Sequence, residues 1–315
     1  MRALAYDRYG SSRNLELREI PTPRPGPGEV LVRVRAAALN PKDVFTMKGR
    51  FRRLSGRRFP KVIGLDLAGE VLAAGPGVVS PRPGDRVFGF LSGFRALRGS
   101  VAEAVAVPVR WVAAMPVRAS FEEAAALALA GSTALQALRD LAHLHPGDRL
   151  LVNGASGGVG AAAIQLGRIL GAEVTALASA GRLDLCRSLG AGEALDYAAG
   201  APLDGDHRFR VVFDVFGNLS YAAARPALPR GGVFVTTVPS RRIVLDALRT
   251  AIGPVRARMV SVKPRTADLE TLARHLDLGV LHPQIDRVFP LAGAAEAVRH
   301  LERRRAHGKV VVRFD

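Results

Sequence analysis

Cysteine is almost absent from this chain: its 315 residues include one, Cys186. A single sulfur cannot form a disulfide within the chain, nor supply the three or four thiolates of a cysteine-type structural zinc site. The composition excludes a disulfide-stabilised scaffold, and we predict a cytoplasmic protein.

Long hydrophobic runs are also lacking. The most apolar stretch, residues 124–138, is interrupted by Gly131, Ser132, Thr133 and Gln136, whereas a membrane-spanning helix needs about 18 apolar residues in a row. The first ten residues, MRALAYDRYG, contain charges where a signal peptide would be hydrophobic. We therefore expect neither a membrane span nor a secretory signal.

Acidic residues are few beside the basic ones, with 28 Asp and Glu against 45 Lys and Arg and a formal charge of +17. Such a charge attracts phosphorylated or acidic partners. The segment from Lys48 to Lys61 has seven basic residues and no acidic one, which indicates either a solvated surface or an anion-attracting rim. Its only aromatic residues are Phe51 and Phe59, and no nucleic-acid-binding motif is present, so we do not expect nucleic acid as a partner.

The arrangement of glycine and proline divides the chain into two regions. In the first third, short alternating segments such as VLVRVRAAAL are separated by turns such as PTPRPGPGE, which predicts antiparallel, barrel-like β structure. From Ser120 a capped, helical pattern begins, and we place a domain boundary near residue 117. Strands and helices then alternate to about residue 262, which predicts a doubly wound parallel sheet. The tail from about 263 is expected to add a helix from about Ala267 to Leu278 and then a strand, a helix and a last strand, which returns to the first domain.

A glycine turn lies between the first strand and helix of this second region, in VNGASGGVGAAAIQL. The strand–turn–helix context is the one in which a G-x-G-x-x-G motif binds a dinucleotide. Ala155 replaces the first glycine, and Gly157 and Gly160 hold the second and third positions. We therefore predict that the turn binds the cofactor pyrophosphate, through Ala155, Ser156, Gly157, Gly158, Val159 and Gly160.

The end of the next strand indicates which dinucleotide is bound. An NAD-preferring site has an acidic residue there, but EVTALA runs into Ser179 and Arg182 instead. A hydroxyl and a guanidinium suit a 2′-phosphate, so NADPH is the predicted cofactor. Arg182 as an ordinary surface cation is the alternative.

Several motifs in the same order resemble the zinc-independent quinone oxidoreductase branch of the medium-chain dehydrogenase/reductase superfamily. They are AAALNPKDV, FPKVIGLDLAGEV, PGDRVFG, LALAGSTALQAL, the glycine turn, LGAGEALDY and HGKVVV. The resemblance implies a GroES-like catalytic domain, residues 1–117 completed by about 263–315, and a Rossmann NADP(H)-binding domain, residues 118–262. It also implies that the nicotinamide lies in the cleft between the domains.

The resemblance also implies that zinc is absent. Asn40 stands where alcohol dehydrogenase relatives have their first cysteine ligand, and Leu65 and Asp66 stand where they have His-Glu. Without a metal, the substrate oxygen must be polarised by hydrogen bonds. The predicted catalytic residues are Asn40, facing the nicotinamide and the substrate oxygen, and Thr133, holding the nicotinamide carboxamide. Asn40 as a simple turn residue before Pro41 is the alternative.

Further cofactor contacts are expected from the fold and the resemblance. Ligands bind at the carboxyl ends of parallel strands, which points to Phe216, Gly217, Thr236 and Val238. Tyr197 resembles the family tyrosine beside the adenosine phosphate, with simple packing as the alternative. Lys309, in HGKVVV, is expected either to reach the cofactor phosphates or to be a surface cation.

These observations predict an NADPH-dependent reductase that delivers hydride to a quinone or to the β-carbon of an enone without a metal. Two alternatives remain: a reductase of another activated alkene or aldehyde, because Phe45 replaces a tyrosine that some relatives have, and a cofactor-binding protein that uses its basic surface for nucleic acid.

Relatives pair the edge strand of the Rossmann sheet, and the run Val255–Val262 suits such pairing. We therefore expect a homodimer.

Overall fold

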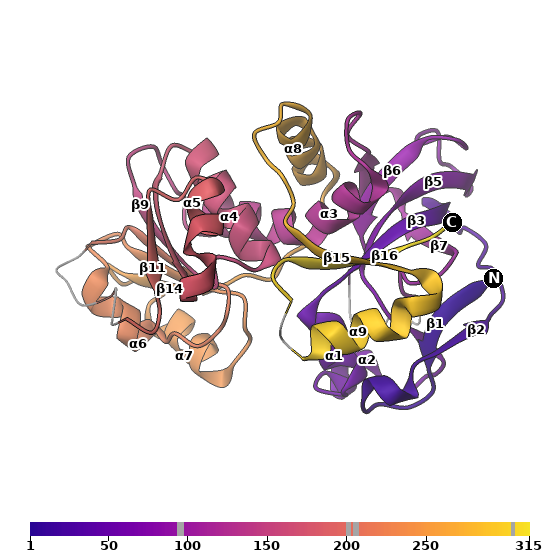
Figure 1. Cartoon of the computed structure of the whole chain (residues 1–315), viewed down its shortest axis with the longest axis horizontal. Coiled ribbons are helices and arrows are strands. Elements are labelled where there is room, and N and C mark those ends of the chain that lie inside the picture. Colours follow the sequence, from indigo (N-terminus) through magenta and orange to yellow (C-terminus); the bar gives the residue numbers. More distant parts are fainter. Residues whose placement is uncertain (93–97, 200–202, 204–207, 304–305) are drawn as a thin grey trace. The chain divides into compact units, whose positions relative to one another are not determined.

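The computed structural model describes residues 1–92, 98–199, 203, 208–303 and 306–315 (Figure 1). The chain divides into two units: Met1–Ser132 with Lys263–Asp315, and Thr133–Val262. The first division falls inside helix α3 (Phe121–Leu135) and not near residue 117. The reason is that the early turns of α3 are bonded to the first unit, where the Leu129 N–H donates to Asp66 Oδ1 at 2.8 Å.

The first unit is built on antiparallel strands, as the sequence predicted. Its larger sheet has the order β15-β16-β3-β5-β6-β8, with β7 also paired to β3, and a smaller sheet has the order β2-β1-β4. The strands are β1 (Arg2–Tyr6), β2 (Glu16–Glu19), β3 (Glu29–Leu39), β4 (Lys61–Val62), β5 (Asp66–Ala74), β6 (Arg86–Phe90), β7 (Ala104–Pro108), β8 (Val112–Ala114), β15 (Ile285–Pro290) and β16 (Lys309–Arg313). The helices are α1 (Pro41–Met47), α2 (Arg52–Ser55), α8 (Thr266–Asp277) and α9 (Ala294–Glu302), with the larger part of α3.

The C-terminal strand completes the sheet of the first unit. β16 pairs antiparallel with the end of β3 and parallel with β15, and Figure 1 shows the yellow β16 alongside the purple β3. The run VVV in β16 is fully buried, so the strand is held by apolar burial as well as by the sheet hydrogen bonds. The expected return of the last strand to the first domain is confirmed.

The second unit is a six-stranded parallel sheet with the order β11-β10-β9-β12-β13-β14. Its strands are β9 (Arg149–Asn153), β10 (Glu173–Ala178), β11 (Glu193–Asp196), β12 (Val211–Asp214), β13 (Val233–Thr236) and β14 (Arg256–Met259). Its helices are α4 (Gly158–Ile169), α5 (Leu183–Ser188), α6 (Tyr221–Ala224) and α7 (Arg241–Arg249). The chain runs outward from β9 to β11 and then outward on the other side from β12 to β14. This order confirms the doubly wound sheet, and it places the switch point, where such folds bind ligands, at the carboxyl ends of β9 and β12.

In the described part of the chain, no helix combines the length and the apolar character that crossing a bilayer requires.

Candidate functional site

The glycine turn joins β9 to α4 in the second unit. Gly157 is the N-cap of α4, no side chain caps the helix, and its first turn contains no acidic residue. The first N–H groups of a helix have no acceptors within it, and the helix dipole favours negative charge there. The start of this twelve-residue helix is therefore suited to an anion such as a pyrophosphate.

Gly157 and Gly160 have different surroundings. A Cβ built on Gly160 would overlap the carbonyl oxygen of Gly154 and the backbone of Ala155, so Gly160 lets α4 pack against the turn. A Cβ built on Gly157 would meet only the Gly154 carbonyl oxygen, at an ordinary 3.5 Å. Nothing within the described chain fills the space above Gly157, which leaves room for a ligand to approach the backbone.

Ser179, Arg182 and Tyr197 gather at the carboxyl ends of two adjacent strands. Ala178 in β10 is in register with Asp196 in β11, and the Tyr197 N–H donates to the Ala178 carbonyl at 3.1 Å. The Tyr197 side chain is 61% exposed, so it is not packed in the core. Arg182 is half-buried as a residue, and no ion pair joins it to a described residue. Residues with a hydroxyl, a guanidinium and a phenol thus follow the ends of these two strands.

Asp214, at the end of β12, organises the neighbouring strand ends. It is fully buried, and its Oδ1 accepts hydrogen bonds from Asn153 Nδ2 at 2.7 Å and from the Gly217 N–H at 2.9 Å. Thr236 Oγ1 lies 3.4 Å from Oδ2. Burial raises the pKa of Asp214, and these donors oppose that rise. The carboxylate therefore joins the ends of β9, β12 and β13, where the predicted cofactor contacts lie.

Four of the predicted cofactor contacts lie at these strand ends. Phe216 and Gly217 follow β12, Thr236 ends β13, and Val238 follows β13. The role of Asp214 was not anticipated. The signal in the sequence was an acidic residue closing the hydrophobic run RVVFD.

In the first unit, three strand ends bring Asn40, Asp66 and Lys309 together. β3 runs antiparallel to both β5 and β16, with Ala38 opposite Asp66 and Leu39 opposite Val310. The end of β3 therefore lies beside the starts of the other two strands. Residues far apart in sequence form one buried cluster as a result.

The cluster is closely hydrogen-bonded. Lys309 Nζ donates to Asp66 Oδ2 at 2.6 Å and to Asn40 Oδ1 at 2.7 Å. Asn40 Nδ2 donates to Asp66 Oδ2 at 2.9 Å. The three residues are at most 5% exposed. Burial raises the pKa of Asp66, whereas the ammonium, the amide and the Leu129 N–H act against that rise. Since every polar contact of Asp66 is with a donor, we assign it as an ionised carboxylate.

This placement corrects one expectation. Lys309 is not a surface cation, because it is buried and its ammonium is bonded within the first unit. Its two partners are Asp66 and Asn40, and a contact of Lys309 with the cofactor phosphates stays a prediction.

Asp43 joins the cluster through helix α1. Asn40 is the N-cap of α1, and its backbone N–H donates to Asp43 Oδ2 at 2.8 Å, while its Nδ2 lies 3.5 Å from the same oxygen. Asn40 thus caps a turn before Pro41 and also belongs to the cluster. Burial, foremost, raises the pKa of Asp43 to about 7, with the Asn40 N–H lowering it and Asp66 raising it further.

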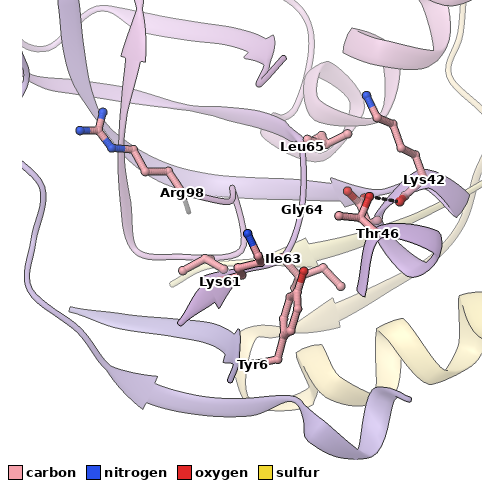
Figure 2. A pocket seen from close by; sticks show the side chains of 10 residues that line it. Tyr6, Lys42, Thr46, Lys61, Ile63, Gly64, Leu65 and Arg98 are labelled. Atoms are coloured by element: carbon pink, nitrogen blue, oxygen red, sulfur yellow. Dashed lines mark hydrogen bonds between the residues drawn. The ribbon is translucent and has the colours of Figure 1, made fainter. Parts of the chain in front are cut away.

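Asp43 is one of the residues that line a small hollow, and Figure 2 shows this hollow with Tyr6, Lys42, Lys61 and Arg98 labelled. Its volume is about 40 Å³, close to that of one water molecule. Tyr6, Lys42, Lys61 and Arg98 also line it. Lys61 Nζ donates to the Ser55 carbonyl at 2.7 Å, and Arg98 pairs with Glu29 at 3.2 Å. The hollow is large enough for water but not for an organic substrate.

The basic segment Lys48–Lys61 does not present one uniform face. Lys48 pairs with Glu302 at 2.7 Å, Arg50 lies over the Phe45 ring at 5.0 Å, and Lys61 is buried. Exposed cations remain at Arg52, Arg53, Arg57 and Arg58. This dispersal disfavours a continuous nucleic-acid-binding surface.

Thr133, the second predicted catalytic residue, lies on α3 one helical turn after Leu129 and is buried. Its contact with a nicotinamide carboxamide stays a prediction.

Comparison with known proteins identifies the class. The alcohol dehydrogenase GroES-like domain family matches residues 26–117, and the zinc-binding dehydrogenase family matches residues 189–312. The chain is 33% identical to the chloroplastic quinone-oxidoreductase QR1 of Triphysaria versicolor, over 99% of this chain and 98% of that protein. It is 36% identical to the 2-methylene-furan-3-one reductase of Solanum lycopersicum, over 99% of this chain and 79% of that protein. The structure of the quinone oxidoreductase from Coxiella burnetii superposes with a TM-score of 0.90 at 29% identity, covering 99% of both chains.

The fold and these matches define an oxidoreductase of the medium-chain dehydrogenase/reductase superfamily. Within that superfamily, the chain belongs to the quinone oxidoreductase branch. The predicted combination of a GroES-like domain with a Rossmann domain is confirmed.

Zinc, which one family description names, does not fit the residues present. The cluster offers an amide and two carboxylates, with no thiolate or imidazole, and Asp66 is already paired with an ammonium. Among the described residues, no group of three or more His, Cys, Asp and Glu side chains is arranged to hold a metal ion. We therefore derive no step through a metal.

Proposed function

We propose that the protein is an NADPH-dependent reductase that transfers hydride to a quinone or to the β-carbon of an enone without a metal. The observation that carries this proposal is the carboxyl edge of the parallel sheet. There, open space above Gly157 and the Arg182 guanidinium provide separate places for a pyrophosphate and a 2′-phosphate. Full-length relatives named as quinone and enone reductases support the same chemistry.

The cofactor would be held by the residues along this edge. The start of α4 would receive the pyrophosphate, and Ser179, Arg182 and Tyr197 the adenosine phosphate. Phe216, Gly217, Thr236 and Val238 would border the rest of the cofactor. NADPH, when bound, supplies the hydride.

The cluster of the first unit would act on the substrate oxygen. Negative charge develops on that oxygen when hydride adds to an enone or quinone, and a fixed donor stabilises it. Asn40 has one N–H directed to Asp66, whereas its contact with Asp43 is long at 3.5 Å and weak. A substrate oxygen can take over this second N–H.

A proton must follow the hydride to complete the product. Asp43 borders the water-sized hollow, and its pKa of about 7 leaves part of the population protonated near neutrality. We place the proton supply on this side of α1, from Asp43 or from water in the hollow.

Enones are favoured by one comparison in particular. The chain is 35% identical to the NADPH-dependent alkenal/one oxidoreductase of Arabidopsis thaliana, over 99% of this chain and 79% of that protein. Another activated alkene or an aldehyde is the second candidate substrate.

The test follows the oxidation of NADPH and of NADH with a panel of quinones, enones and aldehydes. We expect turnover of at least one quinone or enone and a preference for NADPH. An inactive panel combined with tight NADPH binding would support a binding protein instead. Turnover of aldehydes alone would move the assignment to the second candidate.

A further inference from the structure

The buried ammonium of Lys309 contacts two polar side chains, those of Asp66 and Asn40. Its Nζ lies 2.6 Å from Asp66 and 2.7 Å from the amide oxygen of Asn40. The side chains of Lys309 and Asp66 are 6% and 0% exposed. Removing both charges from water is costly, and a buried ion pair is on average no more stabilising than apolar residues of the same volume. Stability alone therefore gives a poor account of this pair.

The pair does determine how the Asn40 amide is oriented. Its carbonyl oxygen accepts from an ammonium, and its NH2 group faces the carboxylates of Asp66 and Asp43. Rotation of the amide by half a turn would set NH2 against an ammonium and a carbonyl against two carboxylates. Only one of the two orientations is compatible with the surrounding charges.

The same contacts affect the strength of the amide as a donor. A cation bonded to an amide oxygen polarises the group, and hydrogen bonds in series strengthen one another in a low-dielectric interior. Lys309 thus fixes the direction of the Asn40 N–H and increases its donor strength. Neither effect requires Lys309 to touch a substrate.

We propose that Lys309, with Asp66 as its counter-ion, is a positioning residue that presents the Asn40 N–H to the substrate oxygen. The proposal rests on the function proposed above. In this account, a built-in ammonium supplies fixed positive charge beside Asn40, where the sequence resembles the first ligand position of zinc-dependent relatives. A separate metal is then unnecessary for orienting the donor.

The first measurement concerns the amide itself and requires no turnover. In ¹⁵N-labelled protein, the Asn40 side-chain NH2 signals are assigned by their loss in Asn40→Ser. We expect slow exchange of these hydrogens with solvent in the native protein. In Lys309→Met, we expect exchange at least about tenfold faster, because a hydrogen bond to a charged group is lost.

The second measurement is kinetic. Lys309→Met should lower kcat by about tenfold to a hundredfold and leave the KM for NADPH within about twofold. Lys309→Arg keeps the charge and should recover part of kcat. The matched control is Arg35→Met, which removes another ion pair between β3 and β5, at 3.1 Å from Glu70, without touching Asn40. Both readouts should be unchanged in this control.

A structural role makes a different prediction. If Lys309→Met does not fold, Lys309→Met combined with Asp66→Asn removes both charges of the Lys309–Asp66 pair and provides the test. A double variant with native thermal stability and slow turnover supports positioning. Native kcat in either folded variant, or unchanged exchange of the Asn40 amide, would overturn it. If the native protein reduces no acceptor, the proposed function fails, whereas the exchange experiment still reports on whether Lys309 holds Asn40.

Discussion

The 2′-phosphate contact can be tested by removing a single guanidinium. Arg182 lies in the short turn after β10, and its backbone N–H donates to the Ser179 carbonyl at 2.8 Å. The residue is half-buried and makes no ion pair with any described side chain. Arg182→Ala therefore removes a positive charge without leaving a described carboxylate unpaired, and the fold should be retained.

The size of the effect follows from the kind of contact. A charge-assisted hydrogen bond contributes about 1.5 to 3 kcal/mol, which corresponds to roughly a tenfold to hundredfold loss of affinity. Only NADPH has the 2′-phosphate that Arg182 would contact. NADPH binding should weaken by that factor, and NADH binding should change little.

The assay is a fluorescence titration of the protein with each cofactor, repeated at about 1 M salt, where the Debye length is about 3 Å. Arg187→Ala is the matched control, because Arg187 is exposed on the adjacent α5 and pairs at the surface with Asp184 at 2.7 Å. Arg187→Ala also removes one positive charge, near Arg182 but with Arg182 itself in place. A specific contact predicts a loss confined to Arg182→Ala and NADPH at high salt. Equal losses for both cofactors that disappear at high salt would show that Arg182 acts only through the general field of a chain with charge +17.

Three further predictions follow from the same structure. Gly157→Val should fold normally and nearly abolish cofactor binding, since its Cβ enters space that no described residue fills; near-native affinity measured by titration would refute this use of the turn. Asp43 has a pKa raised from 3.8 to about 7 in the fold, so its neutral form favours folding, and that contribution declines as the pH rises from 3.8 and is fully lost above about 7. As the pH rises across this range, the free energy of unfolding of Asp43→Asn should therefore increase relative to that of the native protein, by up to about 1.4 kcal/mol per pH unit. A difference in urea midpoints that does not change with pH would contradict the raised pKa. We expect the edge strands β14 of two copies to pair. Light scattering should therefore give the mass of a homodimer, and a monomer mass independent of concentration would exclude the dimer.

Much of the fold could be predicted because local signals agreed with it. Ser120 and Glu123 form the capping box that the sequence suggested at the start of α3, with the Ser120 N–H and Oγ both 2.9 Å from Glu123 Oε2. The alternation of strands and helices predicted the parallel sheet, and its four inner strands, β9, β10, β12 and β13, are buried along most of their length, as expected of strands covered on both faces. The proposed cofactor edge rests on the rule that ligands bind where strand order reverses.

The cluster of the first unit could not be predicted in the same way. Lys309 and Asp66 are separated by most of the chain, and each is an isolated charge within an apolar segment. Their contact depends on β3 lying between β5 and β16, which is a property of the tertiary structure. The first division between the units also differed from expectation, because the Asp66–Leu129 hydrogen bond ties α3 to the first unit.

Isotope transfer tests whether hydride passes from NADPH to an enone or quinone without a metal. Protein treated with a chelator is supplied with NADPH deuterated at the transferable position and with an enone that the native protein reduces. We expect deuterium at the β-carbon of the saturated product and a rate unchanged by the chelator. Loss of turnover on chelation with recovery on adding zinc, or a product without the label, would contradict it.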